Sequence, residues 1–240
     1  MENGIYVSLS AQVARIERLT TIAQNIANSQ TVGFRASEIR FEELVKDMSG
    51  VDTSFSTEGV EYLDETQGAL EQTGNPLDFA VRGDAWFGVQ TPAGPVVTRD
   101  GRFTITPNGE LVSISGYPVL DPGGAPIQLD PAAGAPEVGD DGFIRQGGRQ
   151  IGAIGLFAFE PAPDFQRFGD SGLVVGGELQ PVVDDTSIGV VQGYVEQSNV
   201  NSIHEITQLI EVQRSFEQAA SLMETSEQSV EQLIRAFQSG

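Results

Sequence analysis

Cysteine is absent from this 240-residue sequence, and His204 is its only histidine. The lack of cysteine excludes disulfide bonds, thiolate nucleophiles and Cys-ligated metals. A zinc site would lack ligands, and a Ser-His-Asp triad would have to use His204, which falls off the apolar stripe of a helical pattern. We therefore expect no catalytic, cofactor-binding or metal-binding residue, and we predict that the chain is not an enzyme.

Basic residues are also scarce. The 13 Lys and Arg residues face 34 Asp and Glu residues, which gives a formal net charge of −21. A nucleic-acid backbone or an anionic membrane surface would repel such a chain. No apolar run reaches the roughly 18–20 residues of a membrane span, and the start lacks the basic leader and apolar core of a cleaved secretory signal. We expect no nucleic-acid partner and no direct membrane insertion.

Proline is missing from both ends of the chain, because all 12 prolines fall between residues 60 and 193. At both ends, apolar residues recur at steps of mostly three or four, as on one face of an amphipathic helix. The N-terminal stripe is Ile5, Leu9, Val13, Ile16, Leu19, Ile22 and Ile26, and the C-terminal stripe is Ile203, Ile206, Leu209, Val212, Phe216, Ala219, Met223, Val230, Leu233 and Phe237. An unbroken helix over 199–238 would be about 60 Å long. That length favours a coiled-coil partner.

The middle of the chain alternates short β-branched and aromatic runs with turn pairs. Segments 96–98, 102–106 and 111–114 are separated by Asp100-Gly101 and Asn108-Gly109, which suit tight hairpins. This pattern predicts a meander of antiparallel strands. The expected fold class is α+β, in which N- and C-terminal helices form a coiled-coil-like stem and a mainly antiparallel β-rich domain lies between them. The predicted divisions are 1–50, 51–193 and 194–240.

One segment near the start is more specific than composition. Residues 25–34 read Asn-Ile-Ala-Asn-Ser-Gln-Thr-Val-Gly-Phe. Asn28 can close the first helix, Gly33 can supply a backbone bend and Phe34 can anchor the chain beyond it.

A second such segment precedes the last helix. Residues 193–201 read Gly-Tyr-Val-Glu-Gln-Ser-Asn-Val-Asn, and 213–216 read Gln-Arg-Ser-Phe. Ser198 or Asn199 is a suitable N-cap for the final helix. A turn with a cap can arise anywhere, but that does not explain two specific segments at opposite ends of one chain.

Both segments resemble the flagellar axial family of rod and hook proteins. Members carry an Asn-Leu-Ala-Asn-x-x-Thr-x-Gly-Phe motif near the start, and a Glu-x-Ser-Asn-Val motif before a terminal helix with a Gln-Arg-x-aromatic pattern. The matching residues here are Asn25, Asn28, Thr31, Gly33, Phe34, Glu196, Ser198, Asn199, Val200, Gln213, Arg214 and Phe216. The segments 73–81, 86–89 and 98–103 resemble the family as well, so the likeness covers nearly the whole chain.

Within this family, the short length and the Trp86-Phe87 pair are most similar to proximal rod subunits. The sequence departs from the family pattern at Ala85, where Gly is common, at Val97, where Tyr is usual, and at Glu227, where an acidic position is shifted.

The resemblance implies a structural subunit of the bacterial flagellar basal-body rod, part of a torque-transmitting drive shaft. It implies unfolded export through the flagellar type III apparatus without a cleaved signal, and assembly in the periplasm with copies of itself and other rod proteins. The segments 1–50 and 194–240 would form the inner layer of the rod, and 51–193 its outer domain.

Apolar helix faces that a single chain cannot cover are stabilised when neighbouring subunits pack on them. The predicted assembly interface is Ile16, Leu19, Ile26, Ile206, Leu209, Phe216 and Met223.

Other functions remain open at this point. A distal rod or hook-type subunit would carry similar motifs. The tripeptide Arg82-Gly83-Asp84 motivates a surface adhesin or glycan-binding domain, although a turn between strands accounts for it better. The acidic pairs Asp140-Asp141 and Asp184-Asp185 resemble pieces of calcium loops, but they lack the alternating ligands and closing Glu of an EF-hand and favour acidic turns. A hydrolase that uses carboxylate pairs from such turns would need two carboxyl groups that converge in a cleft.

Overall fold

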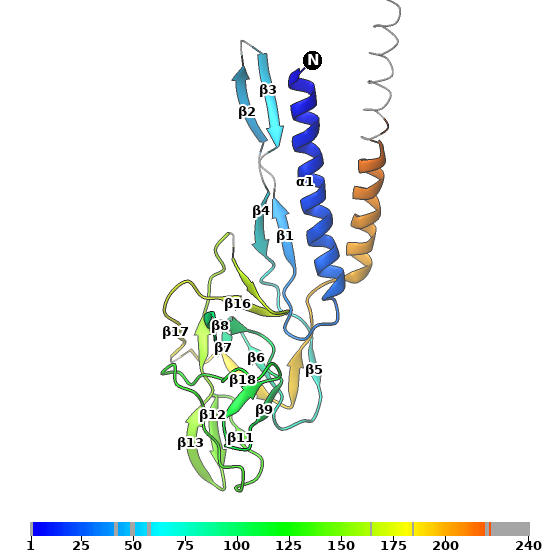
Figure 1. Ribbon diagram of the computed structural model, residues 1–240. Coiled ribbons are helices and arrows are strands. Elements are labelled where there is room, and N and C mark those ends of the chain that lie inside the picture. The colour runs from blue at the N-terminus through cyan, green and yellow to red at the C-terminus, as the bar shows by residue number, and fades with distance from the viewer. Residues whose placement is uncertain are drawn as a thin grey trace, which may run out of the picture. The chain divides into compact units, whose positions relative to one another are not determined.

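The computed structural model describes residues 2–40, 43–48, 51–56, 59–163, 165–183, 185–218 and 221. These residues belong to two compact units that alternate along the sequence (Figure 1). Unit 1 takes its described residues from Met1–Ala27, Ile39–Val60 and Asn201–Gly240, and unit 2 takes them from Asn28–Glu38 and Glu61–Val200. Two of the points at which the chain changes from one unit to the other fall within strands β1 (Ser37–Arg40) and β4 (Val60–Leu63). These two strands pair with each other.

Unit 1 contains helix α1 (Glu2–Ala27), a helix at 202–218, and the antiparallel hairpin of β2 (Glu43–Met48) and β3 (Val51–Ser56). Helix α1 packs against β3. It also contacts the second helix, because Asn25 Nδ2 donates a hydrogen bond to Glu205 Oε1 at 3.3 Å.

The predicted coiled-coil-like stem is wrong. Antiparallel strands dominate the structure, and among the described residues helix is confined to α1 and 202–218. A coiled-coil seam buries its stripe at every turn, but four stripe positions of these helices are 44–78% exposed: Val13, Ile16, Ile203 and Ile206. Helical periodicity identified the helices correctly but could not identify their partner, since α1 packs against β3 as well. The remainder of the predicted 40-residue helix lies outside the described residues.

Within the part of the chain that the structure describes, neither helix combines the length and the hydropathy needed to cross a bilayer.

Unit 2 is built on a six-stranded antiparallel sheet with the strand order β15-β16-β8-β7-β14-β17. Its strands are β7 (Trp86–Thr91), β8 (Gly94–Thr98), β14 (Leu156–Ala158), β15 (Arg167–Phe168), β16 (Gly172–Val174) and β17 (Gln180–Pro181). A three-stranded sheet contains β11 (Glu137–Val138), β12 (Phe143–Gln146) and β13 (Arg149–Ala153). The remaining pairs join β5 (Leu70–Gln72) to β19 (Tyr194–Glu196), β6 (Phe79–Arg82) to β18 (Gly189–Gln192), and β9 (Phe103–Ile105) to β10 (Leu111–Ser113).

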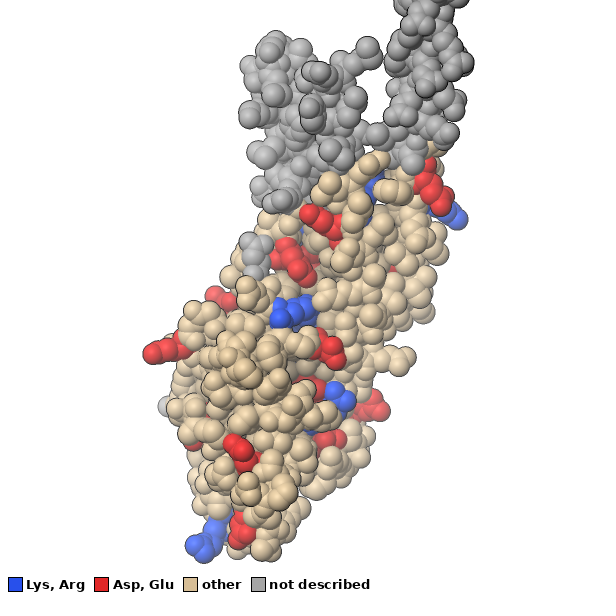
Figure 2. All heavy atoms as spheres, viewed as in Figure 1, with Lys and Arg blue, Asp and Glu red and all other residues tan. Residues whose placement is uncertain are grey.

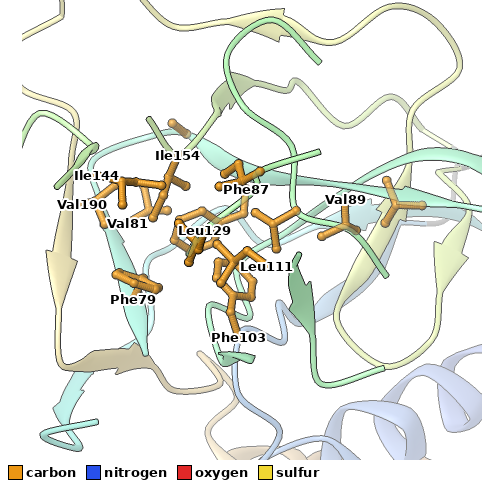
Figure 3. Packing of buried hydrophobic residues seen from close by; sticks show 14 residues of the cluster. Phe79, Val81, Phe87, Val89, Phe103, Leu111, Leu129, Ile144, Ile154 and Val190 are labelled. Carbon is orange, nitrogen blue, oxygen red and sulfur yellow. The ribbon is translucent and has the colours of Figure 1, made fainter. Parts of the chain in front are cut away.

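Strand β7 is buried on both of its faces because successive side chains point to opposite sides of a strand. Phe87 and Val89 enter the larger core cluster, where the Phe87 and Phe103 rings meet edge to face with centroids 5.3 Å apart (Figure 3). Trp86 enters a second cluster with Leu63, Val97, Leu120, Phe157 and Leu173. The sheet therefore has a core on each face, which makes unit 2 the rigid platform for the residues described next.

The turn predictions had mixed outcomes. The Asn108-Gly109 hairpin is confirmed, since β9 pairs with β10 and Gly109 has a φ of +88°. The Asp100-Gly101 hairpin is wrong, because β8 pairs with β7 and β16 rather than with β9. Gly101 is instead required by a close approach: a Cβ there would lie 1.8 Å from the Phe79 carbonyl oxygen.

Candidate functional site

The two end motifs meet inside unit 2. The Gly33 amide donates a hydrogen bond of 2.7 Å to the carbonyl oxygen of Glu196, and the Ala36 amide donates one of 2.7 Å to Asn199 Oδ1. The motif near the start and the motif near the end therefore form one structure, although more than 160 residues separate them.

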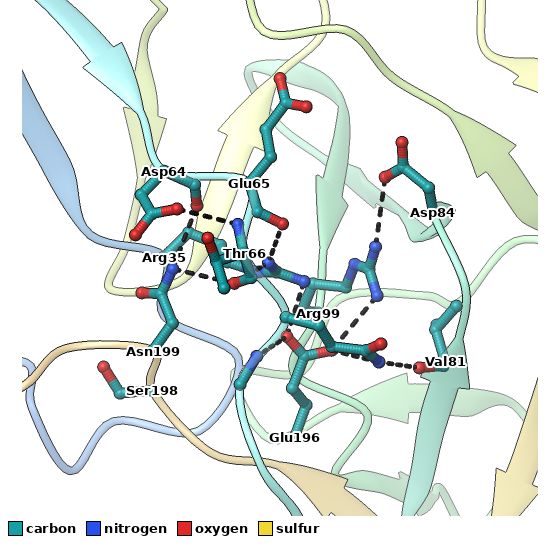
Figure 4. Close-up of polar contacts among 12 residues, drawn as sticks. Arg35, Asp64, Glu65, Thr66, Val81, Asp84, Arg99, Glu196, Ser198 and Asn199 are labelled. Atoms are coloured by element: carbon teal, nitrogen blue, oxygen red, sulfur yellow. Dashed lines mark hydrogen bonds and ion pairs between the residues drawn. The ribbon is translucent and has the colours of Figure 1, made fainter.

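The centre of this structure is the Glu196 carboxylate, whose side chain is only 1% exposed (Figure 4). Its two oxygens face two buried guanidinium groups: Arg35 Nη2 lies 2.7 Å from Oε1, and Arg99 Nη1 lies 3.2 Å from Oε2. The Gly68 amide donates a further hydrogen bond of 3.2 Å to Oε1. We call Arg35, Arg99 and Glu196 the buried triad.

The triad joins three regions of the sequence. Arg35 follows the first motif, Glu196 opens the second, and Arg99 lies in the middle segment 98–103. Trp86 completes the group, because the guanidinium carbons of Arg35 and Arg99 lie 5.7 Å and 5.0 Å from its ring centroid. Cation–π contacts of this kind favour a buried arginine over an apolar residue of the same size, but only while the aromatic ring is present.

The triad carries two cations and one anion. Burial lowers the pKa of Arg99 to about 10 and also lowers the pKa of Arg35, since a charge is less stable away from water, while Glu196 opposes both shifts. Both arginines carry a positive charge at neutral pH, because arginine is effectively always protonated in proteins. The other carboxylate near Arg99 is Asp84, which is 3.6 Å away and 80% exposed. Glu196 is thus the main counter-ion of both buried cations.

Gly33 allows the first motif to reach the triad. Its φ is +71°, and a Cβ at this position would lie 2.2 Å from the Asp100 backbone nitrogen. Both the conformation and the space therefore require glycine. The bend predicted at Gly33 is present, and it places the chain in close contact with the segment that carries Arg99.

Arg167 holds the other side of the first motif. Its guanidinium carbon lies 4.5 Å from the Phe34 ring centroid, and its Nη2 donates hydrogen bonds to the Arg35 carbonyl and to Ser37 Oγ. Phe34 is fully buried. The anchoring predicted for Phe34 is therefore provided by strand β15 of unit 2.

Asn199 ties the second motif to the loop that follows β4. Its Nδ2 donates hydrogen bonds to the carbonyl oxygens of Asp64 and Thr66 at 3.1 Å and 2.9 Å, and its Oδ1 accepts the Ala36 amide. Every polar atom of this side chain is used.

We predict that Asn199→Ala lowers the free energy of unfolding by about 1–3 kcal/mol, because it leaves the buried Ala36 amide without its acceptor. Chemical denaturation of the purified chain measures this. The matched control is Ser198→Ala, since among the described residues the Ser198 hydroxyl accepts one hydrogen bond, from the Val200 amide 3.2 Å away. Equal effects of the two substitutions would contradict the role assigned to Asn199.

The remaining motif residues occupy separate places. Asn28 and Thr31 close the turn after α1, where the Thr31 amide donates to the Asn28 carbonyl at 3.1 Å. Gln213 and Arg214 are exposed on the helix at 202–218, and Val200 is half-buried before it. The predicted N-cap at Ser198 or Asn199 is wrong: Asn201 caps the helix, with its Oδ1 accepting the His204 amide at 3.2 Å.

The residues predicted for an assembly interface lie on the helices of unit 1. Ile16 and Ile206 are 53% and 46% exposed. Four others are half-buried: Leu19, Ile26, Leu209 and Phe216. Met223 lies outside the described residues. None of these placements tests an assembly contact, which stays a prediction.

Sequence reasoning did not identify the roles of the residues that hold the motifs together: Arg35, Trp86, Arg99 and Arg167. A usable signal was present for three of them, since Arg35 directly follows Phe34, and Trp86 and Arg99 lie in segments that resemble the family. Nothing in the sequence showed that their charges would be buried, because a lone arginine is mostly exposed in proteins.

No feature of this site suggests a reaction. The triad carboxylate is fully engaged by its cations, and the described residues contain no group of three or more His, Asp or Glu that could hold a metal. His204 is an exposed helix residue whose ring contacts Gln208 at 2.7 Å. In Arg82-Gly83-Asp84, Arg82 ends β6, and Gly83 and Asp84 lie in the turn to β7, as predicted. The arrangement is that of a structural clasp.

Comparison with known proteins agrees with this reading. Three family models match: "Flagella basal body rod protein" at residues 5–35, "Flagellar hook protein FlgE/F/G D1 domain" at 80–146, and "Flagellar basal body rod FlgEFG protein C-terminal" at 191–236. The flagellar basal-body rod protein FlgF of Mesorhizobium japonicum is 51% identical over 99% of this chain and 98% of its own length. The chain belongs to the family of flagellar basal-body rod proteins.

Two further relatives also match this chain over nearly the full length of both proteins. FlgF of Rhizobium meliloti is 50% identical over 99% of this chain and 98% of its own length, and FlgF of Caulobacter vibrioides is 38% identical over 97% and 98%. The resemblance predicted from the two motifs is confirmed, as are a structural role, the absence of an enzymatic one and a place in the flagellar basal body. The family model matched at residues 5–35 ends at Arg35 of the buried triad. The model matched at 191–236 begins just before Glu196, to which Arg35 is paired.

Proposed function

We propose that the chain is a FlgF-like structural subunit of the proximal part of the flagellar rod, where it transmits torque. The observation that carries this proposal is the similarity to FlgF proteins over nearly the full length of both chains. A shaft subunit needs a rigid body and no chemistry. The two-sided core of unit 2 and the clasp between its end motifs supply that rigidity.

In this proposal the subunit contacts copies of itself and other rod proteins. The segments 1–50 and 194–240 lie in the inner layer of the rod, and 51–193 faces outward. Exposed apolar residues on the unit 1 helices support this assignment, since Ile16 and Ile206 remain half-exposed in the single chain. Export by the flagellar type III apparatus and assembly in the periplasm follow from the same proposal.

The test of the proposal is deletion of the gene in the bacterium that carries it. We expect loss of motility, basal bodies that stop short of a complete rod, and recovery of both by the intact gene. Motile deletion cells with complete rods would contradict a rod function.

A substitution on the helix at 202–218 tests the assembly interface separately. We predict that Ile206→Asp lowers incorporation into basal bodies about tenfold or more, because burial of an isoleucine contributes about 1.5–3 kcal/mol. The folded chain should keep its unfolding midpoint, because the residue is 46% exposed. Quantitative immunoblots of purified basal bodies, alongside thermal denaturation, measure both effects.

The control for this experiment is His204→Asp, which adds the same charge at an exposed position of the same helix. We expect normal incorporation of this variant. If His204→Asp stops incorporation and Ile206→Asp does not, the apolar stripe is not the contact surface.

A further inference from the structure

The hairpin of β12 and β13 carries exposed apolar side chains. Phe143 is 40% exposed and Ile151 is 42% exposed, whereas Ile144, next to Phe143 in β12, is buried in the core. The pairing of β12 with β13 is irregular between Ile144 and Arg145, which leaves Ile151 as the extra residue of a bulge. Such bulges redirect a side chain out of the regular ladder.

The same hairpin is basic on an acidic chain. Arg145 and Arg149 are exposed at its end, and neither forms an ion pair with any residue that the structure describes. The nearest acidic position in the sheet is Glu137, which lies opposite Arg145 in the register of β11. In Figure 2, basic atoms appear at the end of unit 2 where β12 and β13 lie in Figure 1, with acidic atoms beside them. This surface stands out on a chain with a net charge of −21.

A groove of opposite character lies elsewhere on unit 2. It has a volume of about 340 Å³ and is lined by parts of β7, β8 and β16 and by the turn after β10. Tyr117 and Phe168 meet edge to face inside it with ring centroids 5.4 Å apart, and Ile114 at the same groove is 62% exposed. The groove thus offers aromatic and aliphatic surface to a partner.

The charges of the groove are acidic on balance. Asp100 is neutralised by Arg102, which approaches it with two nitrogens at 2.9 Å and 2.7 Å. Asp170 is exposed and has no ion-pair partner among the described residues. An apolar partner with a free guanidinium would satisfy both properties of the groove.

We propose that the β12–β13 hairpin of one copy docks into this groove of the next copy, with Arg145 or Arg149 near Asp170 and Phe143 or Ile151 against Tyr117 and Phe168. The inference rests on the proposed rod function, which supplies neighbouring copies. Hairpin and groove are different surfaces of the same unit, so the contact is heterologous: each copy gives its hairpin and receives another. Contacts of that kind build rings or helical filaments rather than closed pairs.

The absence of cysteine makes a disulfide test clean. A chain carrying both Gln150→Cys, on the hairpin, and Ser115→Cys, in the groove, is expressed in the deletion strain, and its basal bodies are isolated and oxidised. We expect bands of two or more linked copies on a non-reducing gel, and none from either single variant. The control pair Gln150→Cys and Ser187→Cys, exposed on another turn of unit 2, should give only single copies.

Charge exchange gives an independent readout. Asp170→Arg alone and the pair Arg145→Asp with Arg149→Asp should each lower incorporation into basal bodies by about twofold to fivefold, as expected for exposed ion pairs. All three substitutions in one chain should restore incorporation, since every copy then carries the exchanged charges on both the hairpin and the groove.

The outcomes separate the two proposals. Basal bodies that contain the double-cysteine chain but no linked copies would overturn the docking contact and leave the rod function standing. The same holds if the control pair links equally well, or if the exchanged chain is no better than its parents. Absence of the wild-type chain from basal bodies would overturn both.

Discussion

Replacement of Gly33 by alanine is expected to lower the free energy of unfolding by about 2–5 kcal/mol. A left-handed conformation costs an L-residue about 1–2 kcal/mol, and overpacking against rigid surroundings costs about 1–3 kcal/mol more. Both apply here, because φ is +71° and the added Cβ would lie 2.2 Å from the Asp100 nitrogen and 2.5 Å from the Arg99 carbonyl carbon. Backbone atoms cannot rotate out of the way as a side chain can. Urea denaturation of the purified variant measures the loss.

Gly74 supplies the matched control. Its φ of +72° is nearly the same, but no heavy atom lies within 4 Å of a Cβ built there. Gly74→Ala should therefore show only the conformational cost of about 1–2 kcal/mol. The difference between the two variants measures the contact between the first motif and the segment that carries Arg99. In cells, Gly33→Val should reduce motility. If Gly33→Ala and Gly74→Ala lower the free energy of unfolding by the same amount, the close approach of Gly33 to Asp100 and Arg99 adds no cost of its own.

The sequence predicted local elements well where a short pattern determines them. The helix α1 ends at Ala27, next to the Asn28 that was expected to close it. The Asn108-Gly109 turn forms its hairpin because positive φ is a property of that turn itself. The β-rich character of the middle followed from its alternation of apolar runs and turn residues.

Pairing over long distances was not predictable in the same way. The hairpin expected at Asp100-Gly101 fails because β8 finds partners in β7 and in β16, more than 70 residues further along the chain. The coiled-coil-like stem fails because a stripe on a helix shows that a face is apolar, not what covers it. Helix α1 packs against strand β3, a partner that the stripe did not predict.

The candidate site was half predictable. Motif residues such as Gly33, Glu196 and Asn199 were identified from the resemblance, but the reason for their presence was not. Their roles depend on buried arginines from other segments, and the burial of a charge is decided by tertiary packing. An acidic residue at the end of a strand, such as Glu196 in β19, looks in the sequence like any exposed residue until its partners are known.

The largest effect is expected for Glu196→Gln, which keeps the shape of the side chain and removes its charge. Arg35 and Arg99 would then be buried without their main counter-ion, and uncompensated buried charges of this kind cost about 3–5 kcal/mol. Asp84 cannot replace Glu196, since it is 80% exposed and lies 3.6 Å from Arg99. Thermal and urea denaturation of the purified chain should both show the loss.

Glu71→Gln is the control for the loss of one carboxylate. Glu71 pairs with Val195, next to Glu196 in the sheet, but it is exposed and accepts a single hydrogen bond of 2.7 Å from Gln197. Its neutralisation should change stability by no more than about 0.5 kcal/mol.

A second substitution shows whether charge is the cause. If Glu196→Gln acts by leaving two cations unpaired, Arg99→Met in the same chain removes one of them and should recover part of the loss, by about 1 kcal/mol or more. Removal of packing alone predicts the opposite, because each truncated side chain would then add its own cost. A double variant as unstable as the sum of both single variants would therefore show that the buried triad holds the two ends together by its shape and not by its charges.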